Sequence, residues 1–148
     1  MENEGDTGID DGRDEREIVA VLNRLAWVLD ERRWDEFEAI FTPDATAYGA
    51  DGSGPDAIQA TVRRFLGGCG PSQHLLGNHQ IDVDGDNARS RTKVRVMHQG
   101  LDDRADLTYE VFGYYHDDWE RTVDGWRITA REIDVRIQLG DFAVLQPG

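Results

Sequence analysis

The sequence has little cysteine, few basic residues and no long apolar run, and each shortage narrows the possible functions. Cys69 is the single cysteine, so no disulfide can form within the chain, which favours a reducing compartment. No apolar stretch approaches the ~18 residues needed to cross a bilayer, and the first residues lack the basic flank and apolar core of a signal peptide. We therefore expect a cytoplasmic protein without a membrane role.

Positive charge is scarce. The chain has 16 Lys and Arg against 30 Asp and Glu, a formal net charge of −14. Phosphate groups would repel such a protein, so we expect no nucleic-acid partner. Residues 1–13 combine acidic residues and glycines with almost no apolar side chains, and we expect them to form an acidic disordered tail. Residues 14–148 have the length of one domain.

Apolar residues at three- and four-residue spacing predict a helix over residues 15–31. A second, shorter helix is expected over residues 34–41, ending before Pro43, and a short strand over residues 44–48. Pro55 is well placed as the first residue of a third helix, which the glycines at 67 and 68 end.

After Pro71 the apolar period changes from helical spacing to strict alternation. Two hairpins are predicted, with turns at residues 84–87 and 123–125, and each turn contains Asp-Gly. Three helices followed by long antiparallel strands predict an α+β fold in which the helices cover one face of a curved sheet.

His98 is the candidate site residue that alternation identifies most directly. It shares one strand face with Val94 and Val96, while Arg89, Arg91, Lys93 and Arg95 occupy the other. His98 therefore lies in the core or lines a cavity, and a buried histidine with only a structural hydrogen bond fits the pattern equally well.

His74 and Asp30 are candidate site residues only if further structural conditions are met. Alternation from Ile81 and Val83 places His74 on the opposite face, unless Gly77 marks a bulge that reverses the parity. Asp30 ends the first predicted helix, where the helix dipole disfavours a carboxylate, so a histidine partner would be useful there. The alternative is an ordinary helix-end residue. A metal site from Asp30, His74 and His98 can be drawn, but its spacing carries no metal signature.

Several segments, in order, resemble a known family: VLDERRWDEFEAIFTPDATAY, SQHLLGN, IDVDGDNA, VRVMHQG and GYYHDDWERTVDGWRI. They resemble the SnoaL-like group of the nuclear transport factor 2-like superfamily, and within it scytalone dehydratase-like enzymes. The resemblance implies a cone-shaped α+β barrel, in which three N-terminal helices pack on a strongly curved, mainly antiparallel sheet that encloses a pocket. It also implies a homodimer or homotrimer.

The resemblance also implies roles for particular residues. Asp30, His74, His98 and Tyr48 match catalytic positions, and neither a cofactor nor a metal is expected. The side chains expected to bind substrate are Trp27, Phe65, Val96, Phe112, Tyr114, Phe142 and Val144. Leu29 stands where the dehydratase has a tyrosine, so a different substrate is expected.

The function expected from the resemblance is cofactor-independent lyase activity of the dehydratase type, or isomerase or cyclase activity. His74, oriented by Asp30, would remove a proton next to a carbonyl of a hydrophobic polyketide-, steroid- or other polycyclic-like small molecule. His98 would protonate the departing hydroxyl or donate a hydrogen bond to the enolate, assisted by Tyr48. The alternative is a non-catalytic small-molecule-binding or accessory protein on the same fold.

Overall fold

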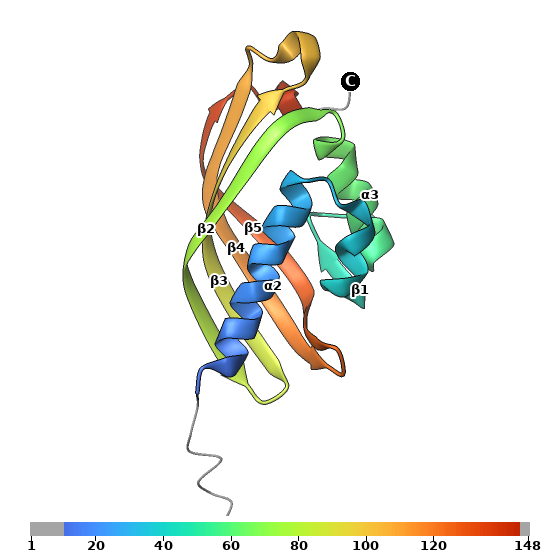
Figure 1. The fold of residues 1–148 in the computed structure, drawn as a ribbon, viewed down its shortest axis with the longest axis vertical. Helices are drawn as coiled ribbons and strands as arrows, with labels where there is room; N and C mark the ends of the chain where they lie inside the picture. Colours follow the sequence, from blue (N-terminus) through green and yellow to red (C-terminus); the bar gives the residue numbers. More distant parts are fainter. Residues whose placement is uncertain (1–10, 146–148) are drawn as a thin grey trace, which may run out of the picture.

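The computed structural model describes residues 11–145 (Figure 1). Most of the predicted acidic tail, residues 1–10, lies outside the described residues. The helical elements come first: α2 (Arg13–Asp30), the 3-10 helix η1 (Trp34–Ala39) and α3 (Pro55–Leu66). The strands are β1 (Phe41–Ala47), β2 (Cys69–Asp84), β3 (Asn87–Gly100), β4 (Thr108–Thr122) and β5 (Gly125–Gly140). Two short 3-10 helices complete the described chain: η2 (Asp102–Arg104) and η3 (Phe142–Leu145).

The five strands form one sheet in the order β1-β5-β4-β3-β2. β1 is parallel to β5, and every other neighbouring pair is antiparallel. The sheet curves around the helices, which lie together on its concave side (Figure 1). This arrangement confirms the predicted α+β fold with helices on one face of a curved, mainly antiparallel sheet.

Helix α2 forms because its apolar residues recur on one face, and that face packs against the sheet. Its buried side chains are Ile18, Leu22, Leu25, Val28 and Leu29. The helix ends at Asp30, and Arg32 then takes a left-handed backbone conformation, with φ of 54°, that turns the chain toward η1. Asp30 is thereby held at the point where the helix meets β2. Neither α-helix within residues 11–145 is long and apolar enough to span a membrane.

The structure corrects two boundaries predicted from the sequence. The expected helix over residues 34–41 is a shorter 3-10 helix, and the strand expected at residues 44–48 begins earlier, at Phe41. Pro43 lies inside this strand, which is possible because β1 is at the edge of the sheet and β5 is its one partner among the described strands. The helix that begins at Pro55 is confirmed.

A bulge in β2 decides which face His74 occupies. Gly77 pairs with Lys93 and Gln80 pairs with Arg91, so two β2 residues lie opposite one residue of β3. Within the bulge, Asn78 has a φ of 50°. The extra residue reverses the alternation, so His74 and the apolar residues beyond the bulge face the same side. This confirms the bulge that Gly77 suggested.

Candidate active site

A cavity of about 540 Å³ lies between the helices and the concave face of the sheet. Its wall is mainly apolar, and η3 contributes to it as well as α3 and the strands. Among the apolar lining residues are Val62, Phe65, Val94, Val96, Val111 and Phe142. Polar side chains interrupt this wall, among them His74, His98, Tyr48 and Arg131.

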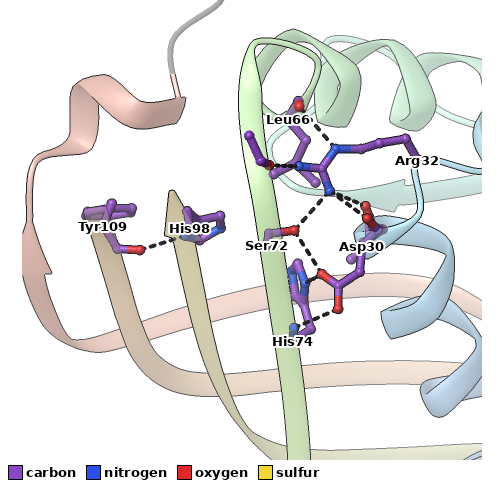
Figure 2. Close-up of polar contacts among 9 residues, drawn as sticks. Asp30, Arg32, Leu66, Ser72, His74, His98 and Tyr109 are labelled. Carbon is purple, nitrogen blue, oxygen red and sulfur yellow. Dashed lines mark hydrogen bonds and ion pairs between the residues drawn. The ribbon is translucent and has the colours of Figure 1, made fainter. Parts of the chain in front are cut away.

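Asp30 and His74 form a hydrogen-bonded pair at the junction of α2 and β2 (Figure 2). His74 Nδ1 lies 2.6 Å from Asp30 Oδ1, and the backbone N–H of His74 donates to Oδ2 at 2.8 Å. The hydroxyl of Ser72 adds a third bond, at 2.9 Å from Oδ1. Burial acts to raise the pKa of Asp30, but its hydrogen bonds and the charge interaction with His74 together lower it.

The ionised carboxylate fixes the tautomer of His74. A carboxylate accepts hydrogen bonds, so the proton of the imidazole lies on Nδ1. The other nitrogen, Nε2, then carries a lone pair and has no protein partner among the described residues, while the ring lines the cavity. His74 is therefore set up to accept a proton from a molecule in the cavity.

His98 faces the cavity from β3, as strand alternation predicts. Its Nδ1 donates to the carbonyl oxygen of Tyr109 at 2.9 Å (Figure 2), and its ring stacks on that tyrosine. The rings of His74 and His98 meet edge to face, with centroids 6.1 Å apart. Burial is the main reason that the pKa of His98 falls to about 4.

This geometry does not suit the proton-donating role expected for His98. At neutral pH the imidazole is uncharged and its single N–H is used by Tyr109, so Nε2 has no proton to donate. His98 instead offers a hydrogen-bond acceptor to the cavity.

A second polar group consists of Tyr48, Arg131 and Asp117. Arg131 makes a bidentate bond to Asp117, with Nε–Oδ1 at 2.7 Å and Nη2–Oδ2 at 2.9 Å, and both side chains are almost completely buried. Arg131 Nη1 donates to the hydroxyl oxygen of Tyr48 at 3.1 Å. Burial raises the pKa of Tyr48, so its hydroxyl keeps its proton and can donate it to an acceptor in the cavity.

The sequence interpretation missed Asp117 and Arg131. Asp117 alternates with the buried Tyr115 and Trp119, a period-two signal that could have placed it on the inner face. Arg131 gave no such signal, because the β4–β5 pairing slips by one residue near Thr129 and reverses the alternation of β5.

Three of the seven expected substrate-binding residues line the cavity: Phe65, Val96 and Phe142. Trp27 does not, because it lies on the solvent-facing side of α2 and is 60% exposed. Val144 is completely buried in the core rather than along the cavity.

Phe112 and Tyr114 lie on the convex face of the sheet, which corrects their expected place in the pocket. Alternation on β4 turns Tyr109 and Tyr115 inward, so the even-numbered residues point outward. On the convex face, the guanidinium of Arg95 lies over the Phe112 ring and those of Arg91 and Arg136 over Tyr114.

Within residues 11–145, no three His, Cys, Asp or Glu side chains are arranged to hold a metal ion. Cys69 is buried, and burial raises the pKa of its thiol, which makes it a poor nucleophile.

Comparison with known proteins identifies the family. A model of the SnoaL-like domain matches residues 11–132. An uncharacterized protein of Mycobacterium tuberculosis is 36% identical over 123 residues, covering 80% of this chain and 82% of the relative.

Solved structures share the fold. A Novosphingobium aromaticivorans protein provisionally named scytalone dehydratase has a TM-score of 0.76 and 23% identity, covering 86% of this chain and 87% of its own. Hexachlorocyclohexane dehydrochlorinase LinA-type3 of Novosphingobium barchaimii has a TM-score of 0.73 and 16% identity, covering 86% and 89%. With the family model matching most of the chain, this protein belongs to the SnoaL-like domain family.

Proposed function

We propose that this protein is a cofactor-independent lyase or isomerase that removes a proton next to a carbonyl of an apolar small molecule. The observation that carries the proposal is the Asp30–His74 pair, whose free imidazole nitrogen opens onto a mainly apolar cavity of about 540 Å³. Such a cavity has room for a polycyclic or polyketide-like compound. The provisional dehydratase and the dehydrochlorinase of the same fold are consistent with elimination chemistry.

In the first step, His74 Nε2 takes a proton from the carbon next to the carbonyl. The imidazolium that forms is stabilised by Asp30, which stays ionised because of its three hydrogen bonds. The carbon–hydrogen electron pair moves toward the carbonyl oxygen and forms an enolate. A properly positioned proton transfer of this kind contributes about 10²–10⁴-fold to the rate.

The hydroxyl of Tyr48 is the donor proposed to stabilise the enolate oxygen. Arg131 has only donors, so it occupies an acceptor site of the Tyr48 oxygen and leaves the O–H hydrogen for the substrate. Because Asp117 neutralises Arg131, this side of the cavity suits an uncharged carbonyl better than a carboxylate.

In a dehydration, the proton held by His74 passes to the departing hydroxyl. The carbon–oxygen bond breaks, water leaves and a carbon–carbon double bond forms. His98 accepts a hydrogen bond from the same hydroxyl through Nε2 and so holds it near His74. In an isomerisation, His74 would return the proton to a different carbon.

The non-catalytic alternative has less support. A protein that only binds a ligand has no need for a carboxylate–histidine hydrogen bond at 2.6 Å and a second histidine ring 6.1 Å away, all at one apolar cavity. Leu29 also lines this cavity where the dehydratase has a tyrosine, which supports a substrate different from that of the dehydratase.

Solvent deuterium exchange tests the proposal whatever the final product of the reaction is. The protein is incubated in D₂O with apolar polycyclic ketones, including β-hydroxy ketones, and mass spectrometry follows deuterium at the carbon next to the carbonyl. We expect exchange or loss of water that depends on His74. Ligands that bind without either reaction would instead support the non-catalytic alternative.

A further inference from the structure

Arg32 lies just after the catalytic candidate Asp30 and makes an unusual set of bonds. It has a left-handed backbone conformation, and its guanidinium group reaches back across the junction of α2, α3 and β2 (Figure 2). The group donates to four backbone carbonyls and one hydroxyl: Leu29 O at 2.7 Å, Asp30 O at 3.2 Å, Leu66 O at 3.2 Å, Gly70 O at 2.7 Å and Ser72 Oγ at 2.9 Å.

The charge of Arg32 has no direct counter-ion within the described part of the chain. No carboxylate of residues 11–145 lies within 4.0 Å of its guanidinium. The hydroxyl of Ser72 instead stands between Arg32 and Asp30, in bonding contact with both. The hydroxyl of Ser72 therefore bridges the guanidinium of Arg32 and the carboxylate of Asp30 by hydrogen bonds.

The direction of this hydrogen-bond chain is fixed by its two ends. A guanidinium can only donate, so the Ser72 oxygen accepts from Arg32. The hydroxyl proton of Ser72 must then be donated to Asp30 Oδ1, the oxygen that also accepts from His74 Nδ1. Each hydrogen bond is therefore donated in the direction from Arg32 through Ser72 to Asp30. The carboxylate of Asp30 remains the acceptor for the Nδ1–H of His74.

We propose that Ser72 and Arg32 are positioning residues for the Asp30–His74 pair. Arg32, acting through Ser72, holds the carboxylate in the orientation that keeps the His74 proton on Nδ1 and leaves Nε2 unprotonated toward the cavity. Neither residue is among those that line the cavity. The catalytic meaning of this role rests on the proposed function, whereas the protonation pattern of His74 does not.

Arg32 also has a purely structural role, because its bonds to carbonyls join the ends of α2 and α3 to β2. Ser72→Ala separates the two roles, since it removes the hydroxyl and leaves every carbonyl partner of Arg32 in place. Ser72→Thr restores a hydroxyl. Ser90→Ala is the matched control, because Ser90 is a buried serine of the same sheet that bonds to Trp119 Nε1, away from the pair.

The test is long-range ¹H–¹⁵N NMR of the His74 imidazole at neutral pH, in full-length protein whose fold is checked by circular dichroism. We expect a single Nδ1–H tautomer in the wild type, Ser72→Thr and Ser90→Ala, and a mixture of both tautomers in Ser72→Ala. A single Nδ1–H tautomer in Ser72→Ala would overturn the proposal.

Arg32 is tested by a double-mutant cycle. Arg32→Lys alone should shift the tautomer ratio, since an ammonium group cannot replace the guanidinium bonds. If Arg32 acts through Ser72, Arg32→Lys should add nothing in a Ser72→Ala background. Independent, additive shifts would contradict the relay.

Activity then distinguishes this proposal from the proposed function. With a ketone that exchanges, Ser72→Ala should lower the maximal rate about tenfold and leave KM unchanged, because Ser72 is not among the residues that line the cavity. The two proposals can also fail separately. If Ser72→Ala changes the tautomer of His74 but no ketone exchanges deuterium with the wild type, the positioning role is supported and the proposed function is refuted.

Discussion

The hydrogen-bonding role of each side chain in this site depends on which of its nitrogen or oxygen atoms carries a proton. His74 and His98 both bind the protein through Nδ1, one to a carboxylate and the other to a carbonyl, so both present Nε2 to the cavity as an acceptor. Tyr48 supplies a hydrogen-bond donor to the cavity, because Arg131 occupies the acceptor side of its oxygen. Together these three side chains give the mainly apolar wall two acceptors and a donor, which match the needs of enolate chemistry.

His98 leads to a prediction about stability and pH. Its pKa in the folded protein is about 4, below the ordinary value of 6.5, so between these values the unfolded chain binds a proton that the folded protein does not. The free energy of unfolding should therefore decrease as pH falls from 6.5 to 4, by about 2 kcal/mol from this residue. Asp30, whose pKa is lowered from 3.8, contributes only at more acidic pH.

Urea unfolding at pH 7 and pH 4.5 measures this effect. His98→Asn keeps a donor for the Tyr109 carbonyl and should remove about 2 kcal/mol of the difference between the two pH values. An unchanged difference in this variant would show that His98 is not a neutral buried group.

The Asp117–Arg131 ion pair gives a prediction about stability alone. Asp117→Asn would leave the guanidinium of Arg131 buried without its counter-ion, and we expect a loss of about 3–5 kcal/mol in the free energy of unfolding. Asp118→Asn is a matched control on the same strand, because Asp118 and its partner Arg89 are both exposed, and it should cost at most about 1 kcal/mol. Similar losses in the two variants would contradict the difference in burial.

Among the secondary-structure elements, β2 and β3 show what alternation in the sequence can predict and what it cannot. Alternation correctly placed His98 on the inner face of β3, because β3 itself has no extra residue and pairs with β4 without interruption. The same rule alone would have turned His74 outward, and only the glycine at position 77 signalled the irregularity. A bulge is decided by pairing with the neighbouring strand, which a single sequence does not display.

The bulge can be tested at Asn78, which is exposed and has a φ of 50°. A β-branched residue is strained in this left-handed conformation, so Asn78→Val should destabilise the protein by about 1–2 kcal/mol, while Asn78→Gly should be close to neutral. Gln80→Val, at an exposed position beyond the bulge, controls for valine in this strand. Equal unfolding midpoints for Asn78→Val and Asn78→Gly would contradict the left-handed backbone.

The order of helices and strands was predictable because the apolar residues change from helical spacing to strict alternation after Pro71. The start of β1 was not, since its backbone partner β5 lies at the other end of the chain and Pro43 was interpreted only as the limit of the preceding helix. Arg131 was missed for a related reason, because the register between β4 and β5 slips beside it and reverses the alternation of β5. Asp117 was missed although its alternation with Tyr115 and Trp119 indicated the inner face.

Over the whole molecule, the convex face of the sheet carries a row of apolar side chains, of which Leu75 and Ile137 are exposed and Phe112 is half-buried. Leu75, Phe112 and Ile137 follow one another across β2, β4 and β5, with Arg95 of β3 between the first two. Met97 and Leu139 continue the apolar surface in the next row, and each is more than 40% exposed. An exposed sheet face of this kind suits contact between copies of the chain.

The homodimer or homotrimer expected from the family resemblance stays a prediction, with this surface as its expected interface. Light scattering during gel filtration should give two or three times the chain mass of 16.7 kDa. Ile137→Glu combined with Leu139→Glu should give the mass of one chain, with an unchanged circular dichroism spectrum. A wild-type mass of 16.7 kDa would refute the prediction.

The most direct test of the account is proton abstraction by the Asp30–His74 pair. With any ketone that exchanges in D₂O, Asp30→Asn and His74→Ala should each lower the initial rate of deuterium incorporation by at least about 10²-fold, with circular dichroism spectra like the wild type. Trp27→Ala, an exposed residue of the same helix, should keep the wild-type rate. Wild-type rates in both Asp30→Asn and His74→Ala would contradict the account.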